Sequence, residues 1–444
     1  MPTALITIAK NGAITARTGL ELTGHNIANV STAGYTRRTA AGAEVAGMGG
    51  IGLNGAGAPG GVRTSAIVRG GAPFQHAEVR RTGSDLARAE AELKSLGQAE
   101  TVIEQSGLYP AMTRFEASVT RLMADPLSGA MRADALEQAR GVAQLFNHVA
   151  RGLDAAADTA LTEAAAGVAE ANRLAAEVAR TNVQLAKVQE GGAGKAALLD
   201  QRDQLLGRLA EYAAITCEFD NLGRTTVRAG GAGGPLLVAG TQHGALVAAQ
   251  DSSGVVQFAV DGEEVLLGSG SLAGRAQALE RLHQVATELD TIAARLIAAG
   301  NAAQAGGVTP DGSAGSALFA GVGAGDIALA LASGDQLATA PPASAPGSRD
   351  SGNVKVLRDA LAGPVEDVDR LLFTLSSAVG GRTTLRDGLR GLADAVQASW
   401  LNGAGVDLDT EAVNLLRFQQ AFQANGKVIQ TAAQIFDTML RIAQ

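Results

Sequence analysis

The sequence predicts a mainly α-helical fold with a β insertion, in which the N- and C-terminal helices pair as a coiled coil. Two seams at the chain ends carry this prediction. Near the C-terminus, alternating steps of three and four residues join Leu415, Phe418, Phe422, Asn425, Ile429, Ala432, Phe436 and Met439. The first thirty residues keep the same alternation at Ile6, Ala9, Ala13, Ala16, Leu20, Thr23, Ile27 and Val30. Neither seam has a local partner, so we expect the ends to pack on each other and then on copies of the chain.

Composition supports long helices and excludes several classes of function. Hydrophobic residues make up 46% of the 444 residues but aromatic residues only 3%, so much of the apolar share is alanine, which favours helices. The formal charge of −8 argues against a nucleic-acid partner. No apolar run reaches the ~20 residues that span a bilayer, so we expect no membrane insertion. No basic region followed by an apolar core marks a cleavable signal, and the single cysteine, Cys217, allows no intrachain disulfide.

The first half of the chain reads as a helical rod. A helix is predicted over 3–30, followed by a break that ends at Gly34, then a glycine-rich, partly hairpin region over 38–75. The helical period returns at Ser84, is interrupted by Pro110 and covers about 111–124. An Ala-rich pattern over about 128–189 would span roughly 90 Å as one helix. This length predicts an elongated helical bundle.

The second half contains the β insertion. A helix over 198–213 leads into 215–268, where Thr, Val and Gly alternate as in short strands. Helix resumes over about 271–299, a Gly/Pro/Ser/Ala-rich loop with one strand pair around 327–331 covers 303–350, and helices fill 353–400. We therefore expect a terminal polymerisation domain (1–37 with 404–444), a helical rod domain (38–214 with 271–403) and an inserted β domain (215–270).

No arrangement of residues supports catalysis, a cofactor or a metal. Gly47, Gly49 and Gly52 match the spacing of a dinucleotide loop, but no helix pattern or acidic residue follows at the required distance, so a plain glycine loop is the better interpretation. The five histidines lack partners at metal-ligand spacing, and no serine lies in a G-x-S-x-G turn. The cluster of Asp407, Asp409 and Glu411 could hold a cation. Its place at the start of a helix favours a role opposite the helix dipole, about 0.3–1 kcal/mol each.

The seams leave two possibilities open. They could form an ordinary helical hairpin buried within one monomer, or a hairpin that also polymerises, and composition does not decide between them. Polar Asn425 would set the register of the helix pair in either case.

Three motifs resemble known proteins. The segment 24–37, GHNIANVSTAGYTR, resembles the N-terminal signature of bacterial flagellar axial proteins, although His25 stands where the signature usually has Asn. The segment 198–205, LLDQRDQL, and the tail 417–425, RFQQAFQAN, continuing to Ile435 and Phe436, resemble the family of flagellar hook-associated protein 1 more than rod or hook subunits. The chain is therefore identified as a member of that family of hook–filament junction proteins.

The resemblance implies a structural protein of the extracellular flagellum. It would be secreted unfolded through the flagellar type III channel, with an export chaperone on the C-terminal helix. It would then self-associate into a short ring between the hook protein and a second junction protein, with the terminal coiled coil lining the axial channel. Only one compact β insertion is evident, so functions of the outer domains of longer members are not carried over.

The seams and the signature also indicate which residues should form the subunit interface and which should form the turn after the first helix. The ends should stay disordered until neighbours cover them. The expected core of the subunit interface is Leu20, Ile27, Leu415, Phe418, Phe422, Ile429 and Phe436. The residues expected to set the turn after the first helix are Asn26, Asn29, Gly34 and Tyr35. The alternatives are a flagellar hook or rod subunit, or a soluble coiled-coil signalling or effector protein.

Overall fold

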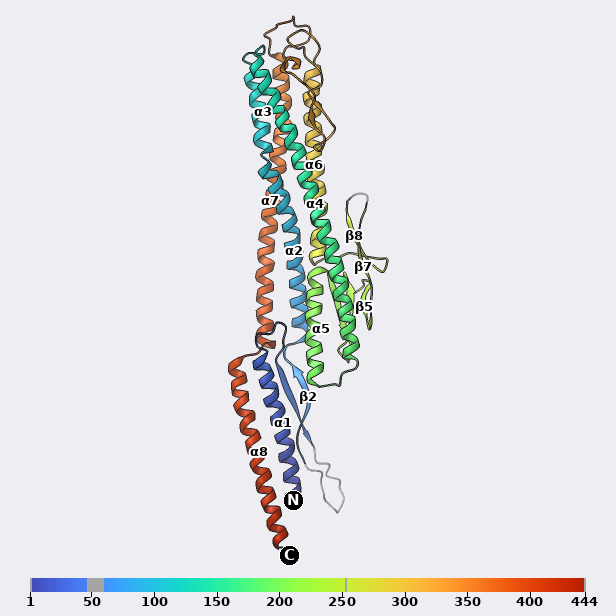
Figure 1. Cartoon of the computed structure of the whole chain (residues 1–444), viewed down its shortest axis with the longest axis vertical. Helices are drawn as coiled ribbons and strands as arrows, with labels where there is room; N and C mark the ends of the chain where they lie inside the picture. The colour runs from blue at the N-terminus through green and yellow to red at the C-terminus, as the bar shows by residue number, and fades with distance from the viewer. Residues whose placement is uncertain (1, 46–59, 252–253, 443–444) are drawn as a thin grey trace.

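The computed structural model describes residues 2–45, 60–251 and 254–442, which form a long rod (Figure 1). The α-helices are α1 (Pro2–Ala28), α2 (Pro73–Ser106), α3 (Leu108–Leu122), α4 (Gly129–Leu185), α5 (Ala193–Tyr212), α6 (Ser271–Ala305), α7 (Gly352–Ala404) and α8 (Leu408–Ile442). The glycines at 47, 49 and 52 lie outside the described residues, so the structure does not bear on their interpretation. Among the described residues, no helix is both long enough and apolar enough to cross a bilayer.

Short strands complete the chain. They are β1 (Arg38–Val45), β2 (Gly61–Arg69), β3 (Ile215–Phe219), β4 (Thr225–Ala229), β5 (Leu236–Ala239), β6 (Gln242–His243), β7 (Leu246–Gln250), β8 (Val256–Val260), β9 (Glu263–Val265), β10 (Phe319–Ala320) and β11 (Ala328–Leu329). β1 and β2 form an antiparallel hairpin that packs along α1. The predicted β insertion is two antiparallel sheets, one ordered β3-β4-β5-β6 and one ordered β7-β8-β9.

The upper rod in Figure 1 is a helical bundle with an apolar core. Helices α2, α3, α4, α6 and α7 surround this core, and its largest side chains, Phe115, Phe146 and Phe319, are at most 2% exposed. A second core joins the far half of α4 to α5, the start of α6 and the two sheets of the insertion. Asn182 of α4 anchors the insertion, because its amide donates to the carbonyl oxygens of Thr225 and Gly240 at 2.8 Å each. The prediction of a mainly helical fold with a small β insertion is confirmed.

Several predicted boundaries differ from the structure. α2 begins at Pro73 and not near Ser84, because proline is suited to the first helical turn and the Gln75 side chain accepts a hydrogen bond from the Ala72 N–H. The break before α3 lies at Gly107, which has φ of 70°, and Pro110 is part of the first turn of α3. The region 353–400 is one helix, α7, which continues through Pro364. The strand pair expected around 327–331 joins β11 to β10.

The two terminal helices lie side by side at one end of the rod and run antiparallel (Figure 1). The start of α1 and the end of α8 therefore lie away from the bundle, and α7 turns into α8 beside the point where α1 leads into β1. The described chain passes between the rod bundle and the part that contains the helix pair and its hairpin at residues 69–73 and 404–408.

Candidate functional site: the terminal helix pair and its joint with the rod

Three matched positions fix the register of α1 against α8. A Cβ added to Gly12 would lie 2.6 Å from the Asn425 side chain, and one added to Gly19 would lie 2.6 Å from the Phe418 ring. One heptad further, Asn26 donates to Glu411 Oε2 at 3.2 Å. Successive positions are seven residues apart on both helices, as in a coiled coil. Glycine on α1 is what lets a phenylalanine and an asparagine of α8 approach its backbone.

The predicted interface residues divide into two groups. Phe418 and Ile429 are half-buried against α1, and so is Leu20 on the facing helix. Leu415, Phe422 and Phe436 stay 37%, 45% and 43% exposed, and Ile27 is 36% exposed. Asn425 faces Gly12 in the pair. The helix pair thus covers only one side of the C-terminal seam.

The joint is the region where the helix pair meets the rod. It consists of Asn26, Tyr35, Thr36, Arg37, Arg38, Arg69, Asp200, Asp203 and Glu411. Asn26, 1% exposed, is one of its buried polar groups. The Asn26 Oδ1 accepts from Tyr35 Oη at 2.9 Å and from the Arg38 N–H at 3.0 Å. The Asn26 amide donates to the Arg38 carbonyl at 2.9 Å. Asn26 therefore ties the end of α1 to the start of β1.

Glu411 of α8 closes the same network from the other chain end. Its carboxylate is 1% exposed and forms an ion pair with Arg37 Nε at 2.6 Å. Glu411 lies in the first turn of α8, as predicted, and its burial next to Arg37 and Asn26 makes it a structural anchor as well. Asp407 does act on the helix end, since its Oδ1 accepts from the Thr410 N–H at 2.6 Å.

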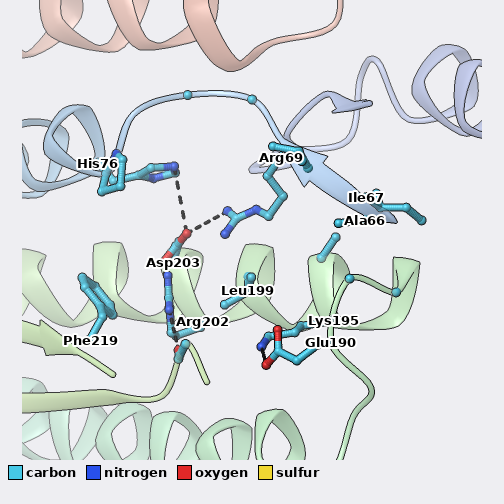
Figure 2. Close-up of a pocket in the computed structure, with 18 of the residues that line it drawn as sticks. Ala66, Ile67, Arg69, His76, Glu190, Lys195, Leu199, Arg202, Asp203 and Phe219 are labelled. Atoms are coloured by element: carbon cyan, nitrogen blue, oxygen red, sulfur yellow. Dashed lines mark hydrogen bonds and ion pairs between the residues drawn. The ribbon is translucent and has the colours of Figure 1, made fainter. Parts of the chain in front are cut away.

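Two carboxylates of the segment 198–205 hold the joint from the rod side. Asp200 accepts from Thr36 Oγ1 at 2.5 Å and pairs with Arg38 at 2.9 Å and Arg69 at 2.8 Å. Asp203 pairs with Arg69 at 2.7 Å (Figure 2) and with the neighbouring Arg202. Buried carboxylates are tolerated where such partners satisfy them. The segment that resembles the junction family is therefore the rod's half of the joint.

The electrostatics of the joint are set by burial and by these cations. Burial alone would raise the pKa of Asp203, but Arg202 and Arg69 outweigh it and hold the pKa below its ordinary value. Burial lowers the pKa of His76, although Asp203, 4.0 Å away, opposes this. Burial also raises the pKa of Tyr35, so its hydroxyl stays protonated and donates to Asn26.

The remaining turn residues lie between α1 and β1. Asn29 bonds backward, with its amide donating to the His25 carbonyl at 2.9 Å. Gly34 has φ of 72°, and a Cβ there would lie 2.2 Å from Gln204 Nε2. The Gln204 amide donates to the Ala33 carbonyl at 2.8 Å. Glycine is needed here because of both the left-handed backbone and the close approach of α5.

The C-terminal end of α7 also packs against the joint. The Arg37 N–H donates to the Ala404 carbonyl at 2.8 Å, and Gly71 approaches Ala404 so closely that a Cβ would lie 2.9 Å from the alanine methyl. Trp400, the sole tryptophan of the chain, donates to His76 Nε2 at 3.4 Å. Sequence reasoning missed these contacts because only the fold brings the segments together. Within the described part of the chain, no three His, Cys, Asp or Glu side chains are grouped so as to hold a metal ion.

Comparison with known families agrees with this architecture. The family model described as "Flagellar hook-associated protein FlgK helical domain" matches residues 96–319, half of the chain. The model described as "Flagellar basal body rod FlgEFG protein C-terminal" matches residues 397–442, which include α8. The first match covers most of the rod, and the second covers the terminal helix that packs on α1.

Individual relatives carry the same name. Flagellar hook-associated protein 1 of Escherichia coli is 25% identical over 559 aligned residues, which cover 99% of this chain and 100% of the relative. Flagellar hook-associated protein 1 of Salmonella typhimurium is 26% identical, with 71% of this chain and 59% of the relative covered. A solved structure of the flagellar hook junction protein FlgK from Burkholderia pseudomallei aligns with a TM-score of 0.45 and 21% identity, over 54% of this chain and 46% of that chain.

The family match over the rod and the full-length similarity to the E. coli protein agree with the resemblance seen in the three sequence motifs. The chain belongs to the flagellar hook-associated protein 1 family, a structural component of the extracellular flagellum at the junction of hook and filament.

Proposed function

We propose that this chain connects hook to filament by self-associating into a short ring through its terminal helix pair. The observation that carries the proposal is the apolar surface left on α8. Leu408, Val413, Leu416, Phe422, Met439 and Leu440 are each 45–65% exposed, which is a large uncovered surface for one helix. Neighbouring copies are the partners that would bury it.

The exposed side chains lie on both flanks of the helix. Leu415 and Phe422 follow Glu411 and Phe418, which face α1, by four residues. Val428 and Ile435 follow Asn425 and Ala432, which also face inward, by three residues. In an α-helix, the residue four positions further lies on one side of the line of residues that face α1, and the residue three positions further lies on the other side. A helix with two different apolar flanks suits a head-to-tail contact that repeats around a ring.

The third face of α8 is mostly polar and includes the exposed charged residues Lys427, Asp437 and Arg441 beside several glutamines. Gln419, Gln423, Gln430 and Gln434 are exposed and lie away from the residues that contact α1. In the ring this face would turn toward the axial channel.

The three parts of the chain would then have separate roles. Residues 1–37 with 404–444 form the polymerisation domain, with the β1–β2 hairpin lying along α1. In the domain proposed over 38–214 with 271–403, the helices α2 to α7 would form a rod that stands outside the channel, and residues 215–270 would form a β domain on the rod. The joint holds the first two parts at a fixed angle through buried ion pairs.

The partners follow from this placement. The ring would adjoin hook protein on one side and a second junction protein on the other. Before assembly, an export chaperone would cover the apolar flanks of α8, and the chain would leave the cell unfolded through the flagellar type III channel. Leu20, Ile27, Leu415, Phe418, Phe422, Ile429 and Phe436 remain the proposed core of the terminal interfaces. Asn26, Asn29, Gly34 and Tyr35 remain the residues proposed to set the turn.

The interface is tested by Phe422→Asp, with Phe373→Asp as its matched control. Phe373 is a 74% exposed phenylalanine of α7, outside the terminal pair. A carboxylate at 422 would have to be desolvated between copies, at several kcal/mol per contact. We expect the Phe422 variant to keep its melting transition and fail to restore swimming to a deletion strain, while the Phe373 variant restores it. Normal swimming with Phe422→Asp would contradict the proposed interface.

The junction role is tested by the deletion strain itself. Without the connecting ring, hooks should stay bare and flagellin should accumulate as monomer in the medium. Electron microscopy of the flagella and a flagellin immunoblot of the supernatant measure both effects. Filaments of normal length on the deletion strain would exclude the proposed role.

A further inference from the structure

A cavity of about 480 Å³ lies beside the joint (Figure 2). The end of β2, the first turns of α2 and the N-terminal half of α5 form its walls, and Phe219 of β3 lines one end. Ala66, Ile67 and Leu199 give it an apolar floor. The cavity is large enough for a bulky apolar side chain and its neighbour.

The cavity wall carries more positive than negative charge. Arg202 pairs with Asp203, Arg69 pairs with both Asp203 and Asp200, and Lys195 pairs with Glu190. Arg80 is different: it lines the cavity, is half-buried, and forms no ion pair with any carboxylate of the described residues. The wall therefore presents one uncompensated guanidinium next to an apolar floor, which suits an apolar side chain beside a carboxylate.

The first turn of α8 has this complementary chemistry. Leu408 is 51% exposed, and the adjacent Asp409 is exposed and has no ion pair within the described part of the chain. The turn lies at the same level of the rod as the cavity, because Ala404 just before it packs on Gly70 and Gly71 of the cavity wall. Figure 1 places the α7–α8 turn on one flank of the molecule and α5 on the other.

We propose that Leu408 and Asp409 of one copy dock into this cavity of the next copy, with Leu408 on the apolar floor and Asp409 beside Arg80. Copies related by rotation about a common axis meet at equal levels, and a knob on one flank with a pocket on the other gives the head-to-tail contact that closes a ring. This inference rests on the proposed ring, and it names a second subunit contact outside the α8 flanks. The pairing of Asp409 with Arg80 at the edge of the cavity would favour this partner and fix how the two copies align.

A cysteine crosslink tests the contact directly in assembled flagella. In a Cys217→Ser background, Leu408→Cys combined with Leu199→Cys should give disulfide-linked dimers and higher oligomers on non-reducing gels of purified hook–filament junctions. Leu408→Cys combined with Val356→Cys is the control, because Val356 is 53% exposed near the far end of the rod. The control should stay monomeric. If the double variant is present at the junction of motile cells without crosslinking, this contact is wrong but the ring stands.

Charge reversal provides the second arm. Arg80→Asp and Asp409→Arg should each reduce swimming in a complemented deletion strain, and the double variant should recover it. Circular dichroism of each purified full chain must show an unchanged melting transition. Loss of swimming in both single variants without recovery in the double variant would overturn the pairing. If the deletion strain itself builds normal filaments, the proposed function fails, and this contact fails with it.

Discussion

The rod bundle and the terminal helix pair are both built from long helices, yet they bury very different amounts of their surface. In the bundle, Phe115 and Phe146 are at most 2% exposed and lie among many other buried side chains. On α8, Glu411 and Ala432 are the buried side chains among those described. Helices of this length draw most of their stability from tertiary packing. We therefore expect the bundle to be stable as a monomer, and the helix pair to gain stability from neighbouring copies.

The largest expected difference between the two regions is in how much a Phe→Ala substitution lowers the free energy of unfolding. Phe146→Ala removes a fully buried ring from the bundle and should lower the free energy of unfolding by about 3–5 kcal/mol. Phe422→Ala removes a 45% exposed ring from α8 and should leave the monomer's unfolding transition within about 0.5 kcal/mol of the parent. Urea denaturation followed by circular dichroism measures both. A comparable loss from Phe422→Ala would show that α8 belongs to the monomer's core.

A second, smaller effect concerns the packing of the pair itself. Gly19→Val places a side chain where the Phe418 ring lies 2.6 Å from a Cβ, and should force the helices apart at a cost of about 1–3 kcal/mol. Gly24→Val is the matched control, because a Cβ at 24 meets nothing within 4 Å. We expect hydrogen exchange in α1 and α8 to accelerate only in the Gly19 variant. Unchanged exchange would mean that the two helices do not pack in this register.

Lowering the pH should break the ion pairs of the joint before it unfolds the bundle. The pKa of Asp203 is lowered in the folded state, so its contribution to stability is complete above about pH 4 and is lost as the pH falls toward the folded pKa. Fluorescence of the sole tryptophan, Trp400, reports on this region. An emission shift below about pH 4 that disappears in Asp203→Asn is the expected result. A shift of equal size in both proteins would assign the acid transition to other groups.

The smallest effect should appear at milder pH. The folded pKa of His76 lies below its ordinary value, so the unfolded chain takes up the proton first and stability declines as the pH falls below about 6.5. Protonation also removes the Nε2 acceptor that receives the Trp400 N–H. His76→Phe should abolish this gentle pH dependence of the thermal midpoint between about pH 7 and 5. The same slope in the variant would exclude His76 as its source.

Local sequence patterns predicted the long helices well, because the signal is local. The Ala-rich pattern over 128–189 contains no proline and is realised as one 57-residue helix, α4. The start of α2 was missed because Pro73, suited to a first turn, was grouped with the glycine-rich segment before it. Likewise, the seam on α8 has a clear period, but the period does not say which edge faces α1. Gly12 and Gly19 decide that, by opening space for Asn425 and Phe418.

The joint could not be predicted from spacing at all. Asp200 is 162 residues from Arg38 along the chain, and Glu411 is 374 residues from Arg37. An ion pair between residues so far apart in the chain produces no local spacing pattern that a single sequence could show. The segment containing Asp200 and Asp203 was noticed only because it resembles a family. Its physical role became clear from the buried ion pairs.

The long sequence separations between the residues of the joint also bear on the order in which contacts form during folding. Asn26 and Glu411 lie 385 residues apart, and closing so long a loop is slow and entropically costly compared with forming α4 or its local contacts. A chain that passes end-first through a narrow conduit would bring out one partner of this pair long before the other. The contact can then form only after nearly the whole molecule has arrived. We therefore expect the joint to form last, so that the angle between helix pair and rod would be set only after the molecule reaches its final position.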